Sequence, residues 1–261
     1  MTKKSHMADV KTNQELWGKQ YDWKSGGDEW SALWGGPDMQ WYGTILPRIQ
    51  QFIPSDTILE IAPGFGRWTN YLRRLADRLI VVDLADKCID HCRKRFESDT
   101  NIEYFVNDGS SLDMLEDNTF GFVFSYDSLV HAELDVMHAY IKQLSVMLSL
   151  NGVAFLHHSN IGEYEATAND LVIAGKDHGR AFSVTAGAVR NCVEEVGLTC
   201  VSQEILNWGG ELMTDCITVC TKKGSVFERP FKTWVNKRFM LEAQQLKELS
   251  GLYGMDSFRK S

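Results

Sequence analysis

Between Thr57 and about Lys222, short apolar runs rich in β-formers alternate with longer stretches whose apolar residues recur every three or four positions. This alternation is typical of a parallel sheet covered by helices on both faces. Seven runs predict strands, at Thr57–Ala62, Leu79–Leu84, Asn101–Asn107, Gly121–Tyr126, Gly152–His158, Thr199–Leu206 and Thr214–Thr221. No helical stretch separates the last two, so we expect the last strand to be antiparallel. The predicted fold is α/β, a doubly wound, seven-stranded and mostly parallel sheet.

The chain divides into a central core and two flanking segments. The α/β core is expected over residues 53–223, and a helical tail over 224–261. Residues 1–6 have the composition of a purification-tag remnant and are set aside. An aromatic-rich helical segment is expected over 7–52, where Trp and Tyr crowd into Leu16–Tyr42. Those rings suit either packing over the sheet or a lid on the acceptor side.

Composition limits the partners and the compartment. The net charge is -8 and no long run of Lys and Arg occurs, so we expect no nucleic acid partner. No apolar run is long enough for a transmembrane segment and none near the start suits a signal peptide, so we expect a cytoplasmic protein. The six cysteines form no C-x-x-C pair, which predicts buried reduced thiols rather than disulfides or a zinc site.

A glycine turn follows the first predicted strand. Glycine has no Cβ and can take positive φ, so a turn holding Gly64 and Gly66 brings backbone N–H groups close to a small ligand. A dinucleotide-binding turn would have a third glycine or alanine where this chain has Thr69, which argues against NAD. Glu60, just before the turn, suits a positively charged ligand better than a pyrophosphate.

Two more acidic residues follow the second and third predicted strands, in Asp83-Leu84 and Asp108-Gly109-Ser110. Together with the glycine turn, this pattern resembles the class I S-adenosylmethionine-dependent methyltransferases, over about Ile53 to Lys222. The resemblance implies a Rossmann-like methyltransferase fold, S-adenosylmethionine as cofactor and S-adenosylhomocysteine as product. One departure stands out, because Ala62 replaces the first glycine of the family's commonest loop.

The same resemblance implies roles for the acidic residues. Glu60 would lie near the methionine ammonium, Asp83 would accept the ribose hydroxyls, and Asp108 would hold the adenine amino group. The expected cofactor-binding residues are Glu60, Ala62, Pro63, Gly64, Gly66, Asp83, Leu84, Asp108, Gly109 and Ser110.

Candidate catalytic residues follow the fourth and fifth predicted strands, where an acceptor would lie above the sheet. His131 is the predicted general base, oriented by Asp127 or Glu133, although a capping or core histidine is the alternative. On the fifth strand, His157 and His158 must point to opposite faces, and we expect His158 to face the cleft as a second candidate. Because adjacent histidines diverge, no metal site is expected.

Acceptor-side residues are drawn from the aromatic and polar side chains around these strand ends. The candidates are Asn160, Arg180, Trp208, Asp215 and Trp34, with Asp177 and His178 of lower weight. Aromatic rings beside hydrogen-bonding groups suit a sugar, whose apolar face stacks while its hydroxyls bond. The resemblance extends to bacterial sugar and small-molecule O-methyltransferases, so the predicted reaction is O-methylation of a sugar or glycan hydroxyl, as in polysaccharide biosynthesis.

Two alternatives remain open. One is methylation of a natural-product or lipid-like small molecule. The other is a non-catalytic, cofactor-binding scaffold for a glycan-assembly partner. Assembly with further copies of the same chain, as a homo-oligomer, is compatible with either function. Turnover separates an enzyme from a scaffold, because a scaffold would bind S-adenosylmethionine without forming S-adenosylhomocysteine.

Overall fold

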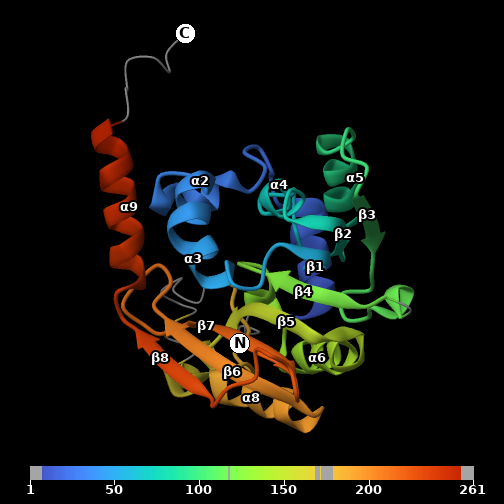
Figure 1. Ribbon diagram of the computed structural model, residues 1–261. Helices are drawn as coiled ribbons and strands as arrows, with labels where there is room; N and C mark the ends of the chain where they lie inside the picture. The colour runs from blue at the N-terminus through green and yellow to red at the C-terminus, as the bar shows by residue number, and fades with distance from the viewer. Residues whose placement is uncertain (1–7, 117, 168–170, 172–178, 254–261) are drawn as a thin grey trace, which may run out of the picture.

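The computed structural model describes residues 8–116, 118–167, 171 and 179–253. Its centre is an eight-stranded sheet with the order β3-β2-β1-β4-β5-β7-β6-β8 (Figure 1). The strands are β1 (Ser55–Ile61), β2 (Ala76–Asp83), β3 (Ile102–Val106), β4 (Phe120–Ser125), β5 (Leu148–Ser159), β6 (Leu198–Leu206), β7 (Asp215–Lys222) and β8 (Lys232–Asn236). Strand β7 runs antiparallel to both of its neighbours, and the other pairings are parallel.

The helices of the described residues fall into three sets. The N-terminal turns are α1 (Val10–Glu15), η1 (Leu16–Gln20), η2 (Asp28–Trp34), α2 (Pro37–Gln40), η3 (Trp41–Ile45) and α3 (Leu46–Ile49). The connections between strands hold α4 (Thr69–Leu72), α5 (Asp86–Arg95), η4 (Asp113–Leu115), η5 (Leu129–His131), α6 (Leu134–Met147), η6 (Ile161–Thr167) and α8 (Ala186–Glu195). The chain then ends its described part with α9 (Phe239–Tyr253).

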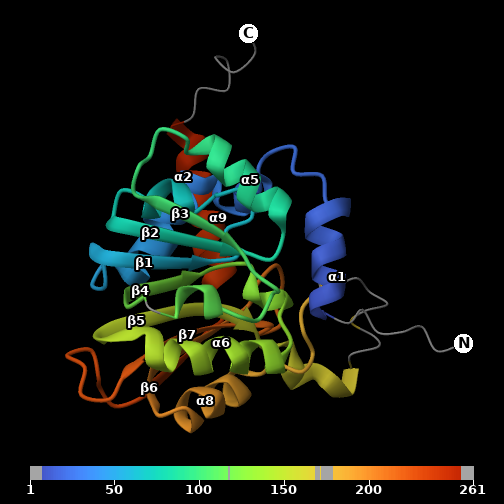
Figure 2. The ribbon, with the colours of Figure 1, turned by 90° about the vertical axis from the view of Figure 1, so that its right-hand side faces the viewer.

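Both faces of the sheet are buried, because successive strand side chains point to opposite sides. Leu59 of β1 packs with α6 and α8 in one core, whereas its neighbour Ile58 packs with α5, α9 and the N-terminal helices in the other. In Figure 2, α6 and α8 lie on the near side of the sheet and α9 lies on the far side. The result is a three-layer arrangement of helices, sheet and helices.

The predicted α/β fold, a mostly parallel sheet whose seventh strand is antiparallel, is confirmed, with one difference in the number of strands. The sheet has an eighth strand, β8, because residues 232–236 pair in parallel with β6. The prediction of a helical tail from residue 224 onward is therefore only partly correct, because an edge strand precedes α9. Residues 1–6 lie outside the described part. Among the helices that the structure describes, none has both the length and the apolarity needed to cross a bilayer.

The topology brings the carboxyl ends of β1, β2 and β4 together at one edge of the sheet. In parallel α/β sheets, ligands bind in the crevice beyond these ends. The helix α1 stands beside this edge in Figure 2. Residues 8–34, called the N-terminal cover below, therefore lie over the place where a ligand would bind.

Candidate active site

A pocket with a cavity volume of about 80 Å³ lies where β1, β2 and β4 end. Its walls from the α/β core include Ile61, Ala62, Gly64, Val82, Asp83, Leu84, Gly109, Asp127, Ser128 and His131. Its walls from the N-terminal cover are Ala8, Val10, Asn13, Trp17, Trp23 and Trp30. One pocket thus joins the predicted cofactor loop, the predicted base and three tryptophans of the cover.

The loop after β1 is tightly wound. Ala62 has φ 58°, Gly64 has φ 58° and Gly66 has φ 83°. Ala62 stands where the family's commonest motif has glycine, and its Cβ makes the left-handed conformation cost about 1–2 kcal/mol. Among the described non-glycine residues, positive φ occurs at Ala62 and at Asp127, and both line this pocket. Backbone strain of this kind gathers at functional sites.

The two strained turns are tied together. The Ser128 hydroxyl, which follows Asp127, donates to the Ala62 carbonyl at 2.7 Å. The Ser125 hydroxyl at the end of β4 donates to the Ile61 carbonyl at 2.9 Å. These bonds join the loop after β1 to the loop after β4, so the two halves of the pocket are held in a fixed relation.

Asp83 lies at the end of β2 in the pocket wall. Its Oδ2 accepts the Gly64 N–H at 3.1 Å, and its Oδ1 accepts the Ala85 N–H at 2.9 Å. Burial raises the pKa of Asp83 to about 6, although these two N–H bonds act in the opposite direction. Each carboxylate oxygen has a second lone pair, so this side chain can still accept hydroxyl donors from a ligand.

Glu60 lies beneath the glycine loop and is 1% exposed. Its Oε2 accepts the Thr69 hydroxyl at 2.6 Å, whereas Oε1 is buried and has no partner among the described residues. Burial raises the pKa of Glu60 to about 8, the Thr69 hydroxyl opposes this rise, and the nearby charge of Asp83 adds to it. An unsatisfied buried carboxyl oxygen at this place fits a cationic ligand nearby.

The predicted adenine residue, Asp108, is exposed and does not belong to the pocket wall. Its Oδ1 accepts the N–H groups of Ser110 and Ser111 at 2.8 and 2.7 Å, and these bonds lower the pKa of Asp108. Gly109 beside it does line the pocket, and a Cβ there would come within 2.7 Å of Val10. The α1 helix therefore occupies the space next to this loop.

Five of the predicted cofactor-binding residues line the pocket directly, namely Ala62, Gly64, Asp83, Leu84 and Gly109. The other five, Glu60, Pro63, Gly66, Asp108 and Ser110, belong to the same strand ends and loops but not to its wall. Asp83 and the unsatisfied oxygen of Glu60 thus offer complementary partners for hydroxyls and for a cation. The residues present fit S-adenosylmethionine, which carries both.

His131 ends η5 and lines the pocket. Its Nδ1 lies 2.8 Å from the Gly179 carbonyl, which can only accept, so Nδ1 carries the proton and Nε2 has a free lone pair in the neutral ring. Burial lowers the pKa of His131, and the Gly179 bond partly offsets this effect. The ring is further held by Trp17, whose ring centroid lies 5.1 Å away.

The groups that orient His131 differ from those predicted. Asp127 is bound to Arg67 at 2.7 Å, and Glu133 accepts from the Ala8 N–H at 3.2 Å and from Ser183. The Gly179 carbonyl takes their place. A backbone acceptor brought in from a distant part of the chain gives no sequence signal.

The expectation that His158 faces the cleft is wrong. His158 is fully buried, with Nδ1 against the Ser159 carbonyl and Nε2 against the Thr218 hydroxyl, both at 2.7 Å. Burial lowers its pKa to about 4. Its neighbour His157 points to the other face, where Nδ1 accepts the Asp127 N–H at 3.0 Å. His158 therefore does not line the pocket, whereas His157 contacts the site by accepting the backbone N–H of Asp127.

The five predicted acceptor residues also need correction, because none of them lines the pocket. Trp34 is fully buried and donates to Thr44, and Trp208 packs on it with ring centroids 5.2 Å apart. Asn160 bridges the Met213 carbonyl and the Ala186 N–H.

The remaining two acceptor candidates, Arg180 and Asp215, form a buried ion pair behind His157. They therefore support the site from behind. Asp177 and His178 lie outside the described residues.

Three tryptophans of the pocket and an arginine next to one of them were not predicted individually. Trp17, Trp23 and Trp30 line the pocket from the cover, and the guanidinium of Arg67 lies 5.6 Å from the Trp30 ring. Arg67 is 6% exposed and donates to the Asp127 carboxylate. Its sequence signal was a charged residue directly after the second glycine of the loop, where a buried helix begins.

Residues 58–152 match the family model described as a methyltransferase domain. Over these residues the chain is similar to a methyltransferase domain. This match covers the glycine loop, Asp83 and His131. It confirms the predicted resemblance to S-adenosylmethionine-dependent methyltransferases, and with it the cofactor.

Solved structures support the same fold. The N-methyltransferase NodS from Bradyrhizobium japonicum, in complex with S-adenosylhomocysteine, aligns with a TM-score of 0.55 at 17% identity, covering 84% of this chain and 99% of that one. Magnesium protoporphyrin IX methyltransferase from Synechocystis, also with S-adenosylhomocysteine, aligns with a TM-score of 0.57 at 13% identity, covering 82% and 100%. At such identities the likeness shows the fold.

A curated relative is similar over a shorter region. The probable ribosomal RNA small subunit methyltransferase A of Methanosarcina mazei is 36% identical over 63 residues, which are 24% of this chain and 23% of that protein. The similarity thus spans about a quarter of the length of this relative.

Proposed function

We propose that this protein transfers a methyl group from S-adenosylmethionine to a hydroxyl group of a small acceptor. One observation carries the proposal: a single pocket joins Asp83 and the glycine loop on one side to His131 and Asp127 on the other. A methyl donor and an acceptor must meet within bonding distance, and an enclosed site that holds both would supply this proximity.

The cofactor side would be formed by the loops after β1 and β2. Asp83 would accept the ribose hydroxyls, and Glu60 would complement the positive charge of the methionine part beneath the loop. When bound, S-adenosylmethionine supplies a methyl group already activated by its sulfonium. The protein's own task is then to align the acceptor and to receive its proton.

His131 is the proposed base. Its Nε2 has a free lone pair because Nδ1 is committed to Gly179, and its lowered pKa keeps the ring neutral near pH 7. Asp127 binds Arg67 through Oδ2, so Oδ1 would be the oxygen that accepts a hydrogen bond from the acceptor. Nε2 would take the proton that the hydroxyl loses.

The acceptor class that we propose is a sugar or glycan. Trp17, Trp23 and Trp30 present ring surfaces to the pocket, and Asp127 and His131 present hydrogen-bonding groups. This combination suits a molecule with apolar faces and hydroxyl edges. A cavity of about 80 Å³ is far below the roughly 300–1,000 Å³ typical of ligand pockets, so the N-terminal cover must move outward to admit cofactor and acceptor.

The test is methyl transfer from S-adenosylmethionine to a panel of monosaccharides, oligosaccharides, lipid-like alcohols and amines, with S-adenosylhomocysteine as the readout. We expect turnover with sugar hydroxyls, lowered about 10²- to 10⁴-fold in His131→Ala with unchanged cofactor affinity. His138→Ala, a partly exposed histidine of α6, is the matched control and should keep turnover. Turnover confined to amines would overturn the hydroxyl assignment, and binding without turnover on any acceptor would indicate a scaffold.

A further inference from the structure

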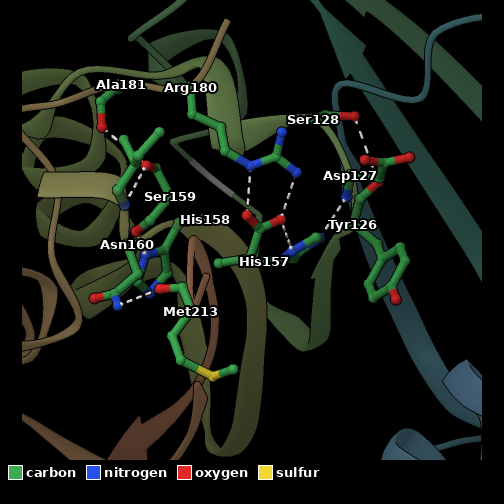
Figure 3. A network of polar contacts seen from close by, with 12 residues as sticks. Tyr126, Asp127, Ser128, His157, His158, Ser159, Asn160, Arg180, Ala181 and Met213 are labelled. Carbon is green, nitrogen blue, oxygen red and sulfur yellow. Dashed lines mark hydrogen bonds and ion pairs between the residues drawn. The ribbon is translucent and has the colours of Figure 1, made fainter. Parts of the chain in front are cut away.

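A network of buried polar contacts lies behind the pocket and connects Arg180 to the loop after β4. Arg180 donates to both carboxylate oxygens of Asp215, with Nη2 2.8 Å from Oδ2. The same Oδ2 lies 3.0 Å from Nε2 of His157, whose Nδ1 accepts the Asp127 N–H at 3.0 Å. Figure 3 shows Arg180, His157 and Asp127 along this line.

All residues of this network are buried. Asp215 and His157 are completely buried, and Arg180 is 4% exposed. Burial alone would raise the pKa of Asp215, but Arg180 and His157 outweigh it and hold that pKa well below its ordinary value. Asp215 is therefore an anion neutralised by Arg180.

The contacts also fix the tautomer of His157. A backbone N–H can only donate, so Nδ1 must be the unprotonated acceptor and Nε2 must carry the proton toward Asp215. Protonation of Nδ1 would set two N–H groups against each other. His157 thus donates toward Asp215 through Nε2 and accepts from Asp127 through Nδ1, while Arg180 pairs with the same carboxylate.

Asp127 is the residue that needs such support. Its φ of 62° lies in the left-handed region, which aspartate tolerates better than most residues but which still strains a residue with a Cβ, and it lines the pocket beside His131. Two groups hold it: Arg67 binds its carboxylate, and His157 binds its backbone N–H. A strained conformation persists only where its surroundings determine it.

We infer that His157 is a positioning residue that holds the strained Asp127 turn, so that the Asp127 carboxylate meets the acceptor in register with His131. This inference rests on the proposed function for its catalytic consequence, and on the structure alone for the hydrogen bond. Loss of the bond should let the turn relax, and displacement of a positioning group by about 1 Å costs up to about 10²-fold in rate.

Two substitutions of His157 test the roles of its two ring nitrogens separately. In His157→Asn, the amide oxygen replaces Nδ1 and can still accept the Asp127 N–H, whereas the contact with Asp215 is lost. In His157→Gln, the longer side chain can still donate to Asp215, whereas the acceptor for Asp127 is lost. His158→Gln, on the opposite face of the same strand, controls for disturbance of the buried strand.

We expect His157→Gln to lower kcat by about 10- to 100-fold with unchanged affinity for S-adenosylmethionine, and His157→Asn to stay within about 3-fold of wild type. The melting temperatures of all three variants are measured alongside. His158→Gln should lose stability and keep kcat. Equal losses of kcat in the Asn and Gln variants, in step with their melting temperatures, would overturn the inference.

A second measurement does not depend on catalysis or on the variants folding. In wild-type protein labelled with ¹⁵N, a coupling across the hydrogen bond should link the Asp127 amide nitrogen to Nδ1 of His157. Absence of this coupling in well-resolved spectra would refute the positioning role. Its presence in a protein without turnover would leave the hydrogen bond established and reject the proposed function instead.

Discussion

Glu60 gives the sharpest quantitative test of the site, through the pH dependence of stability. Burial raises its pKa from 4.5 to about 8 in the folded protein without cofactor. A difference of 3.5 units corresponds to about 5 kcal/mol between the protonated and ionised forms, since one unit is worth about 1.4 kcal/mol. The folded state binds the proton more tightly than the unfolded chain, so this contribution is complete below about pH 4.5 and is lost as the pH rises toward 8.

The substitution Glu60→Gln removes the titrating group and keeps an oxygen that can accept from Thr69. We expect the free energy of unfolding of wild type to fall relative to Glu60→Gln by about 2 to 3 kcal/mol between about pH 5 and pH 7. Above pH 8 the variant should be the more stable protein. Urea unfolding at several pH values measures both.

Two controls isolate the effect. Asp83, whose pKa is also raised, is present in both proteins, so only its interaction with Glu60 enters their difference. Glu97→Gln makes the same substitution at an exposed carboxyl and controls for the loss of one acidic side chain. A wild-type minus Glu60→Gln difference that stays constant from about pH 5 to pH 9 would refute the argument, because it would mean that Glu60 ionises as freely when folded as when unfolded.

Three further outcomes are expected. Asp83→Ala should weaken S-adenosylmethionine binding in calorimetry by at least about 10-fold, since each charge-assisted hydrogen bond is worth about 1.5–3 kcal/mol; unchanged affinity would remove Asp83 from the site. Ala62→Gly should raise the free energy of unfolding by up to about 1 kcal/mol by relieving the positive φ, and a loss of stability would contradict the strain. Chelation with EDTA should leave turnover unchanged, because the described residues bring no three metal-ligating side chains together, and recovery by added Mg²⁺ or Zn²⁺ would reverse this view.

The sheet could be predicted because its central strands are buried on both faces and read as continuous apolar runs. Strand β8 could not, since four of its five residues are exposed, including Trp234 and Val235, and no apolar alternation marks it. It forms because the edge of β6 offers unpaired backbone groups. An edge strand of this kind is determined by its neighbour more than by its own sequence.

The cofactor loops could also be predicted, because each lies directly after a strand and its residues are close together in the chain. The acceptor side depends on contacts between distant segments. Trp17 reaches His131 across more than a hundred residues, and the choice between His157 and His158 depends on which face of β5 looks toward the pocket. Strand alternation correctly separates the two histidines but does not say which face is which.

Several features of the pocket lower the stability of the folded protein without cofactor. The left-handed turn at Ala62 costs about 1–2 kcal/mol, the one at Asp127 costs less because aspartate tolerates this conformation better, and ionising buried Glu60 costs about 5 kcal/mol more. Domains are stable by only about 5–15 kcal/mol, so these terms are large, and the two apolar cores on the faces of the sheet must offset them. An ionised carboxylate that is buried without a partner lowers the stability of the folded protein, and a cation bound beside it offsets that cost. Cofactor binding should therefore stabilise the protein more at pH 8 than at pH 6, because only at the higher pH is there a buried charge to neutralise.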